Sequence, residues 1–202
     1  MIDLVVAHYN EDIQWLKTLD GNVIVYSKGL NGDLPNMGRE SHTYLHHIVE
    51  NYDAICARPM ATTVFLQGCI ADHIQNKKES DFVAKLVSEA QQNGKSQNAQ
   101  VWNVGYYNAR WDLKIPEQPN VKPCTLAFGP WFVLYVSQIF PFEDLKWYMG
   151  GLFAMRNDVI TNRPKHYYQN LLVQLSDSEN PAVGHYFERA WYYIFKHSNH
   201  IL

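Results

Sequence analysis

Three short apolar runs, separated by segments with helical periodicity, constrain the fold of this chain most. Residues 2–7, 23–26 and 62–66 are mainly apolar and rich in β-branched side chains, as strands buried on both faces of a sheet are. Residues 12–19 and 44–52 place their apolar side chains along one helical face. This alternation within about seventy residues predicts an α/β fold, with a mostly parallel, right-handed βαβ sheet flanked by helices.

The second part of the chain predicts more helices and a further strand. Residues 95–130 contain prolines and aromatic residues without a clear period, so strands and long loops are expected there. Elsewhere the periodicity predicts a glycine-led strand at residues 150–156 and helices at residues 80–92, 130–139, 164–175 and 181–195.

Length and charge limit the domain organisation and the class of partner. The 202 residues suffice for one substantial core, and no linker or repeat divides them, so a single domain over residues 1–202 is expected. The formal net charge of −3 lacks the basic excess of proteins that bind the phosphate backbone. We therefore expect no nucleic acid as the main partner.

Cysteine content and the first residues indicate the compartment. Cys56, Cys69 and Cys124 are widely spaced and form no CxxC pair, so neither a disulfide framework nor a structural zinc site is expected. The chain opens directly on an apolar strand-like run without a basic leader, and no window reaches the length of a membrane span. A cytoplasmic protein is expected; the oligomeric state is left open.

Polar residues follow each of the first three predicted strands. These segments are residues 8–11, 27–29 and 67–69. Because parallel strands end at the same edge of a sheet, and ligands of such sheets bind beyond that edge, the three loops are expected to form one site.

The start of the helix that follows the second strand has the features of an anion site. Asn36 and Gly38 supply turn chemistry, and Gly38 would let a ligand approach the first backbone N–H groups. Arg39 opposes the helix dipole in the first turn but suits a bound anion. An ordinary turn with a solvated Arg39 and Glu40 is the alternative.

Taken together, these motifs resemble the GT-A glycosyltransferases. Four motifs carry the resemblance. They are an apolar strand ending in Tyr-Asn-Glu, a helix start of the form Asn-x-Gly-basic, a strand of small residues late in the chain, and an acidic residue beyond that strand. The pattern is most similar to the glycosyltransferase domain that decorates capsid proteins of large algal viruses, and to related fungal proteins. It rests on residues 5–11, 36–39, 42–45, 65–68, 150–156, 163–164 and 187–189.

The resemblance implies transfer of a sugar from a UDP-sugar to a hydroxyl group of a glycan or glycoprotein, with Mn²⁺ or Mg²⁺ as the cofactor. Residues 1–75 would be the nucleotide-binding half and residues 76–202 the acceptor-side half. The host cytoplasm would be the compartment of a viral member. One departure is that Gln67 and Gly68 stand where the family carries Asp-x-Asp. Asp72 is then the candidate metal ligand, with His73 as a second ligand.

The remaining roles are implied by the same resemblance. The base and ribose of the donor would be held by Ala7, His8, Tyr9 and Glu11. Nucleotide or sugar contacts would come from Gly38, Arg39, His42, Gln67, Gly68 and Gly151. For the catalytic base, the first candidate is Glu188, placed where an acidic residue often opens a helix, and the second is Asp158. Alternatively, Glu188 caps a helix, and His8 and His42 are ordinary hydrogen-bonded histidines.

Two other classes of function remain open from the sequence. A nucleotide-sugar or carbohydrate-binding module without turnover is favoured by the missing Asp-x-Asp. A metal-dependent hydrolase would use His8, His42, Asp72 and His73, and requires those four side chains to converge.

Overall fold

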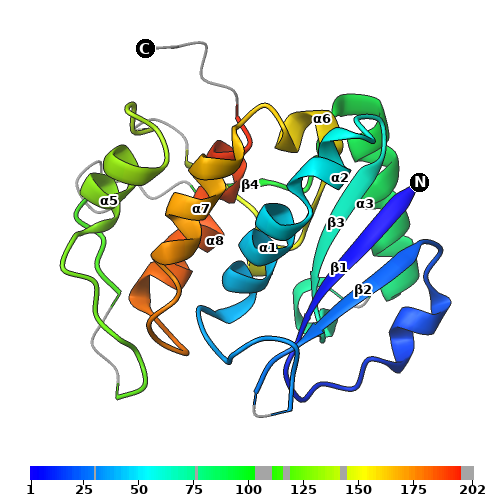
Figure 1. The fold of residues 1–202 in the computed structure, drawn as a ribbon, viewed down its shortest axis with the longest axis horizontal. Helices are drawn as coiled ribbons and strands as arrows, with labels where there is room; N and C mark the ends of the chain where they lie inside the picture. The colour runs from blue at the N-terminus through cyan, green and yellow to red at the C-terminus, as the bar shows by residue number, and fades with distance from the viewer. Residues whose placement is uncertain (30, 76, 103–110, 116–118, 142–144, 197–202) are drawn as a thin grey trace.

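A mostly parallel sheet forms the centre of the computed structural model, which describes all residues except 30, 76, 103–110, 116–118, 142–144 and 197–202 (Figure 1). β1 pairs in parallel with β2 on one side and with β3 on the other, and β6 pairs antiparallel with β3. The strand order is therefore β2 (Asn22–Ser27), β1 (Ile2–His8), β3 (Thr62–Gln67), β6 (Phe153–Arg156). This confirms the predicted α/β class and the mostly parallel sheet.

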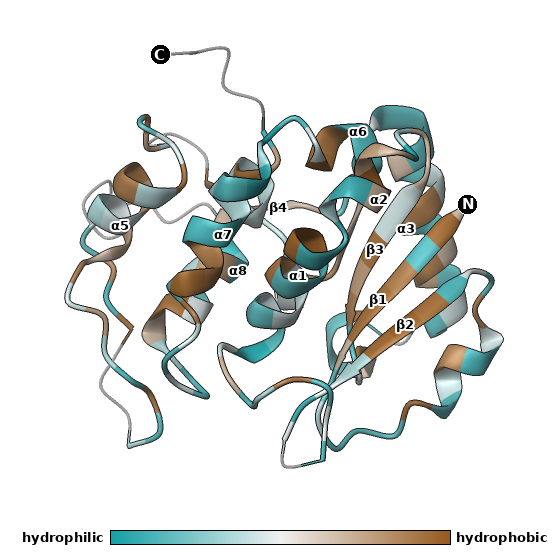
Figure 2. Cartoon of the chain, in the orientation of Figure 1, coloured by the Kyte–Doolittle hydropathy of each residue, from teal (hydrophilic) through white to brown (hydrophobic). Residues whose placement is uncertain are grey.

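Both faces of the sheet are buried, which explains the continuous apolar runs. Leu4 and Val6 of β1 belong to one core cluster, whereas Val5 and Ala7 belong to the other. Successive side chains of a strand point to opposite faces, so each face receives alternate residues. Figure 2 shows the apolar strands between helices that carry their hydrophilic residues outward.

Helices pack on each face of the sheet. α3 (Glu79–Asn93) packs on one face through Val83 and Leu86, and α1 (Arg39–Glu50) on the other through Tyr44 and Leu45. α7 and α8 extend the layer of α1 (Figure 1). The other α-helices are α2 (Tyr52–Cys56), α5 (Phe128–Tyr135), α6 (Asn157–Ile160), α7 (Lys165–Val173) and α8 (Ala182–Ile194).

Short elements complete the described chain. β4 (Gln100–Trp102) and β5 (Leu145–Trp147) form a separate antiparallel pair. Three 3₁₀ turns are η1 (Gln14–Thr18), η2 (Ala71–His73) and η3 (Met149–Gly151). Of the described helices, none is long and apolar enough to cross a membrane.

Some predicted elements differ from the observed ones for local reasons. Residues 12–19 were expected to form an α-helix, but only the 3₁₀ turn η1 is present. The strand predicted at 150–156 begins at Phe153, because Gly150 and Gly151 have φ angles of 64° and 65°, outside the strand region. Both halves of the predicted domain nevertheless build the same sheet, since β6 from residues 76–202 pairs with β3.

Candidate functional site

A cleft of about 330 Å³ opens where β1 and β3 end. Its lining combines three of the predicted motifs: the loop after β1, the start of α1 and the end of β3. Among the predicted site residues it contains Ala7, His8, Tyr9, Glu11, Arg39 and Gln67, and it adds Lys28, Asn36, Glu40, Glu179 and Asn180.

The loop after β1 is held by its own side chains. Oε2 of Glu11 accepts hydrogen bonds from the backbone N–H groups of Tyr9 at 2.7 Å and Asn10 at 3.2 Å. The ring of His8 lies 3.0 Å from Ser27 Oγ and 3.2 Å from the carbonyl oxygen of Glu11. These contacts leave Tyr9 half exposed at the cleft. Glu11 and His8 therefore shape the loop, and Tyr9 is the side chain presented to a ligand.

Gly68 supports this loop and does not line the cleft. A Cβ at Gly68 would lie 2.7 Å from Glu11 Oε2, so only glycine permits the close approach. Its carbonyl accepts a hydrogen bond from Trp15 Nε1 at 2.7 Å. The preceding side chain, Gln67, donates from Nε2 to the carbonyl of Gly150. The predicted contact of Gly68 with the donor is thus replaced by a packing role.

The turn before α1 contains two consecutive left-handed residues. Gly38 has a φ of 59° and Arg39 a φ of 53°. The N–H of Gly38 donates to the carbonyl of Ser178 at 2.8 Å, and a Cβ there would lie 2.6 Å from that of Leu175. The glycine is therefore required by packing against the loop after α7, a correction to its predicted contact with a ligand. Arg39 is strained, since side chains other than glycine rarely adopt this conformation.

Lys28 stabilises the strained turn through its side-chain ammonium group. The sequence did not predict this residue as part of the site. It is only 8% exposed, and Nζ donates to the carbonyl oxygens of Met37, at 2.5 Å, and of Arg39. Burial lowers the pKa of Lys28 to about 8, while the nearby Glu40 opposes the shift. A lysine directly after an apolar strand, within one of the three predicted loops, was the available signal.

Arg39 lies between a carboxylate and a histidine. Its Nε is 3.5 Å from Glu40 Oε2, and one terminal nitrogen is 3.2 Å from His185 Nε2. Burial, with the charges of Arg39 and Arg189, lowers the pKa of His185 to about 4. His185 is thus neutral at pH 7, and the Arg39 side chain remains 39% exposed.

Two carboxylates flank the glycine pair that precedes β6. The N–H of Gly150 donates to Oε1 of Glu188 at 3.1 Å. A Cβ at Gly151 would lie 3.7 Å from Oε1 of Glu40. Glu188 lies in the middle of α8 and does not open a helix, so the predicted dipole effect does not apply. Glu40, which the sequence left as a solvated residue, has a side chain only 10% exposed.

Asp72 and His73 occupy η2, beyond the end of β3. Asp72 Oδ1 and His73 Nε2 are 3.6 Å apart, and the Asp72 side chain is 72% exposed. A Cβ at Gly150 would lie 2.7 Å from the His73 ring. In the described part of the chain, no group of three or more His, Cys, Asp or Glu could hold a metal ion. The pair fits an ion that takes its other ligands from phosphate and water.

Asp158 and His42 lie away from the cleft. Asp158 pairs with Arg156 through contacts of 2.8 and 2.7 Å, and Arg156 is aligned with Thr62 at the start of β3. Asp158 is therefore at the opposite edge of the sheet, because β6 runs antiparallel. His42 is 6% exposed, and burial lowers its pKa to about 4. Neither the second candidate base nor His42 is positioned to touch a ligand in the cleft.

The comparison with protein families covers nearly the whole chain. Residues 4–201 match one family model, described as "Protein of unknown function (DUF3431)". The chain belongs to this family. No curated protein and no solved structure matches the chain significantly.

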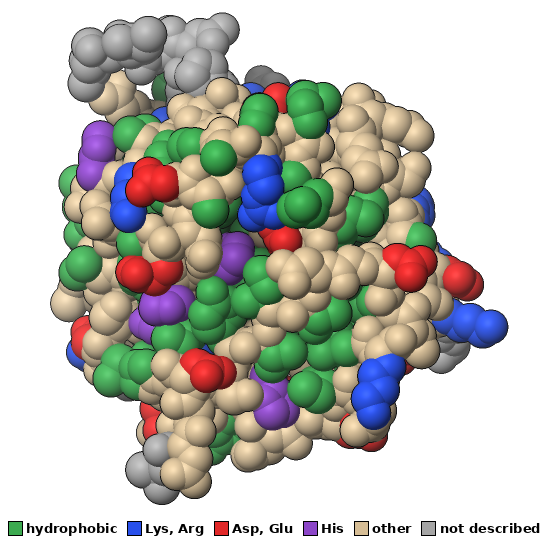
Figure 3. Space-filling view, turned by 45° about the vertical axis from the view of Figure 1, so that its right-hand side comes forward, with side chains coloured by type: hydrophobic (Ala, Val, Ile, Leu, Met, Phe, Trp, Pro, Cys, Tyr) green, Lys and Arg blue, Asp and Glu red, His purple; other side chains and the backbone are tan. Residues whose placement is uncertain are grey.

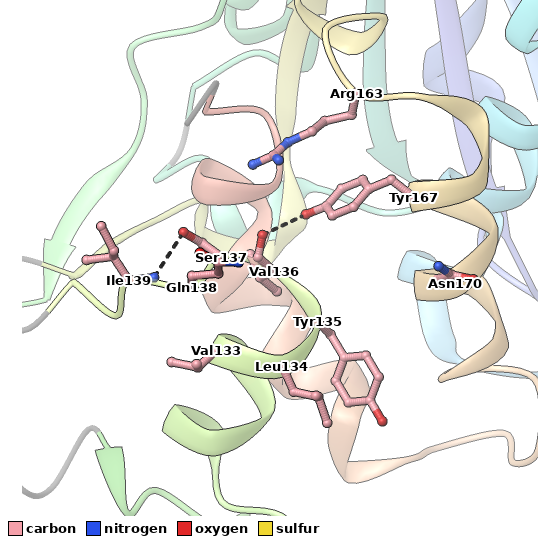
Figure 4. Close-up of a pocket in the computed structure, with 10 residues that line it drawn as sticks. All are labelled: Val133, Leu134, Tyr135, Val136, Ser137, Gln138, Ile139, Arg163, Tyr167 and Asn170. Carbon is pink, nitrogen blue, oxygen red and sulfur yellow. Dashed lines mark hydrogen bonds between the residues drawn. The ribbon is translucent and has the colours of Figure 1, made fainter. Parts of the chain in front are cut away.

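A hollow of about 300 Å³ between α5 and α7 lies apart from the predicted residues (Figure 4). Arg163 stacks over the ring of Tyr167 at 4.8 Å, and the Tyr167 hydroxyl donates to the carbonyl of Val136 at 3.1 Å. None of the residues predicted for the site lines it. This hollow of the DUF3431 chain lies between α5 and α7 and does not adjoin the cleft at the ends of β1 and β3.

Charge on the surface is mixed. On the face seen in Figure 3, Lys and Arg side chains are separated by acidic and uncharged residues. The cleft of the DUF3431 chain repeats this mixture on a small scale, with Lys28 and Arg39 beside three glutamates: Glu11, Glu40 and Glu179. A ligand carrying both an anionic group and hydroxyl groups would match both signs of charge.

Proposed function

We propose that this protein is a glycosyltransferase that moves a sugar from a UDP-sugar to a hydroxyl group of a glycan on a glycoprotein. One observation carries the proposal: three segments far apart in the sequence line a single cleft at the carboxyl ends of parallel strands. These are the segments that resemble glycosyltransferase motifs, and ligands of α/β sheets bind at this edge.

The donor would lie along the cleft from Tyr9 to Gly151. The exposed ring of Tyr9 suits stacking on the uracil. The diphosphate would be held by Arg39 and Lys28, two cations that line the cleft near the start of α1. Glu40 lies beside Gly151 and can accept hydrogen bonds from the hydroxyl groups of the sugar.

Asp72 and His73 would hold the divalent ion expected for such a reaction. Their two ligand atoms are 3.6 Å apart and can face the same ion. Mn²⁺ accepts a carboxylate and an imidazole together, whereas Mg²⁺ prefers oxygen ligands. When bound, the ion supplies positive charge that stabilises the departing diphosphate.

Glu188 is the candidate base. In a transfer that inverts the anomeric carbon, the acceptor oxygen bonds to that carbon while its bond to the diphosphate oxygen breaks. The electron pair leaves with the diphosphate, and the proton of the acceptor passes to the carboxylate of Glu188. The hydrogen bond from Gly150 holds one carboxylate oxygen, and the other is 3.7 Å from Arg189.

The test combines donor binding with turnover. Thermal unfolding of the chain is followed with uridine, guanosine and cytidine diphosphates, with and without Mn²⁺, and UDP-sugars are then assayed for release of UDP. We expect selective stabilisation by UDP, since stabilisation follows occupancy and reaches roughly 2.7 kcal/mol at a hundredfold excess over Kd. No response to any nucleotide would refute the proposal.

A binding module without turnover is the second candidate. The exposure of Asp72 favours it, because a carboxylate open to water holds a metal less firmly than an enclosed one. Donor binding without UDP release, in the presence of any glycan acceptor, would support this reading. The hydrolase alternative has no such support, since its four side chains form no cluster among the described residues.

A further inference from the structure

A smaller hollow of about 130 Å³ adjoins His73 and Met149, next to Gly150. It is formed by η2 and the loop after it, α3, β4 and the region of η3. Its lining consists of His73, Ile74, Gln75, Lys77, Phe82, Lys85, Leu86, Asn98, Gln100, Met149 and Leu152. Apart from His73, the residues predicted for the site do not include these side chains.

The hollow is positively charged. Lys77 and Lys85 line it, and its lining includes neither aspartate nor glutamate. Lys85 lies 3.7 Å from Glu89 one turn along α3, with side chains 64% and 20% exposed, so Glu89 offsets part of the charge of Lys85. An anionic group would therefore be favoured here over a neutral one.

The remaining polar lining suits hydroxyl groups. Asn98 Nδ2 donates to the carbonyl of Leu152 at 2.8 Å. Its Oδ1 is buried and has no hydrogen-bond partner in the described part of the chain. A buried carbonyl oxygen without a partner is costly, and here it belongs to a residue that lines the hollow. The ring of Phe82 and the amide of Gln100 complete a wall with one aromatic face and hydrogen-bonding groups.

Backbone strain is present at the same place. Gln75 has a φ of 53°, one of two described residues other than glycine with a positive φ, the other being Arg39 in the donor cleft. Such conformations are sparsely populated and cluster at ligand sites and other functional sites. Arg39 thus lines the donor cleft, and Gln75 lines this smaller hollow.

We propose that this hollow binds the acceptor, and that the acceptor is a sugar carrying a carboxylate or another anionic group. The inference rests on the proposed function, because the acceptor must reach the donor cleft. His73 lines the hollow and contacts Gly150, whose N–H holds Glu188 and whose carbonyl accepts from Gln67. The hollow and the candidate base Glu188 are therefore both next to Gly150, the hollow through His73 and Glu188 through its hydrogen bond.

The test compares two ligands that differ only in the carboxylate. Methyl β-glucuronide and methyl β-glucoside are titrated into the full chain, with saturation-transfer NMR as the readout and UDP as competitor. We expect the glucuronide to bind more tightly than the glucoside, and UDP not to displace it. Equal binding of both ligands, binding of neither, or displacement by UDP would each overturn the proposal.

Variants locate the ligand. The Lys77→Gln, Lys85→Gln double variant should weaken glucuronide binding about tenfold, because two charge-assisted contacts are lost, and should leave UDP binding unchanged. Phe82→Ala should weaken both sugars. Lys165→Gln on α7 serves as the matched control. An unaltered glucuronide affinity in the double variant would refute the site. If the unaltered chain binds the glucuronide but does not bind UDP, the proposed function is refuted and the anionic-sugar site is not.

Discussion

The N–H of Gly150 donates a hydrogen bond to Oε1 of Glu188 across 3.1 Å. This contact joins the middle of α8 to the glycine pair that precedes β6. On the other side of the pair, Glu40 approaches Gly151 from α1. Two buried glycines thus bring carboxylates of α1 and α8 close to one short backbone segment.

Replacing Glu188 by glutamine should abolish most turnover and leave donor binding unchanged. Glutamine keeps the size of the side chain and can still accept from Gly150, but it cannot take a proton. General-base catalysis contributes typically 10²–10⁴-fold, so UDP release in the presence of acceptor should fall by about that factor. Initial rates measure the loss, and UDP titration measures binding.

Asp158→Asn is the matched control for that variant. Its partner Arg156 lies at the opposite edge of the sheet, so turnover should stay within about twofold while the midpoint of unfolding falls slightly, as for other exposed ion pairs. Normal turnover in Glu188→Gln would remove Glu188 from the role of base.

Lys28→Met should weaken UDP binding at pH 7 by about tenfold, because a cation that lines the cleft is lost and the carbonyls of Met37 and Arg39 lose their donor. Lys28→Arg should restore part of the affinity. Lys17→Met, on η1, should bind UDP normally. Calorimetric titration below the unfolding temperature separates weaker binding from loss of fold.

The pH dependence of UDP binding provides a second readout for Lys28. Burial lowers its pKa to about 8, with Glu40 opposing the shift. The other charged or titratable groups that line the cleft are His8, Glu11, Arg39, Glu40 and Glu179. As the pH rises from 7 to 9, Lys28 loses its proton and affinity for UDP should fall. Lys28→Met should show a flatter profile over this range; an identical slope in both proteins would contradict the role.

Removal of divalent ions should stop transfer and leave the fold intact. Asp72 and His73 lie in a short turn outside both core clusters, so EDTA should not shift the midpoint of thermal unfolding. Asp72→Asn should raise the Mn²⁺ concentration for half-maximal activity by roughly 10- to 100-fold, since a charged ligand is lost. Asp53→Asn, on α2, is the control. Full activity in EDTA would refute the metal site.

Acid should destabilise the protein through two buried histidines. Burial lowers the pKa of His42 and of His47 from 6.5 to about 4. Around His42 the charged or titratable groups are Lys28 and His46, and around His47 they are Asp3, His46 and Arg58. Between pH 6.5 and 4 the unfolded chain binds more protons than the folded chain, so stability falls as the pH is lowered through this range.

The unfolding midpoint measures this loss. It should drop by on the order of 10 °C between pH 6.5 and 4.5 from these two groups. Combining His42→Gln with His47→Gln should reduce the slope, whereas His166→Gln, at an exposed position on α7, should leave it unchanged. If the unfolding midpoint of the double variant depends on pH as steeply as that of the unaltered protein, the acid sensitivity arises from other groups.

The sheet and the position of the cleft could be predicted from the sequence, because both follow from local patterns. Apolar runs mark β1, β2 and β3, and parallel strands bring their ends to one edge. The role of Lys28 could not be predicted, since it depends on two carbonyl groups of a distant turn. Asp158 was misplaced because no local pattern reveals that β6 runs antiparallel.

Glycines show the same limit. Gly38 was expected to let a ligand approach the helix start and Gly68 to contact the donor, yet each permits a protein contact, with Leu175 and Glu11 respectively. The sequence indicates that a small residue is needed at such positions. It does not indicate which neighbour requires it, because that neighbour comes from another part of the chain.

The reversed direction of β6 has a consequence for how the protein can change. Its first residues, and not its last, lie beside the ends of the parallel strands, so the glycine pair lies near the end of β3, where the carbonyl of Gly150 accepts from Gln67. Inserting or deleting one residue between Gly151 and Phe153 would either displace the glycines or turn every side chain of β6 to the other layer. Evolution or engineering can therefore vary this corner by substitution far more easily than by changing its length.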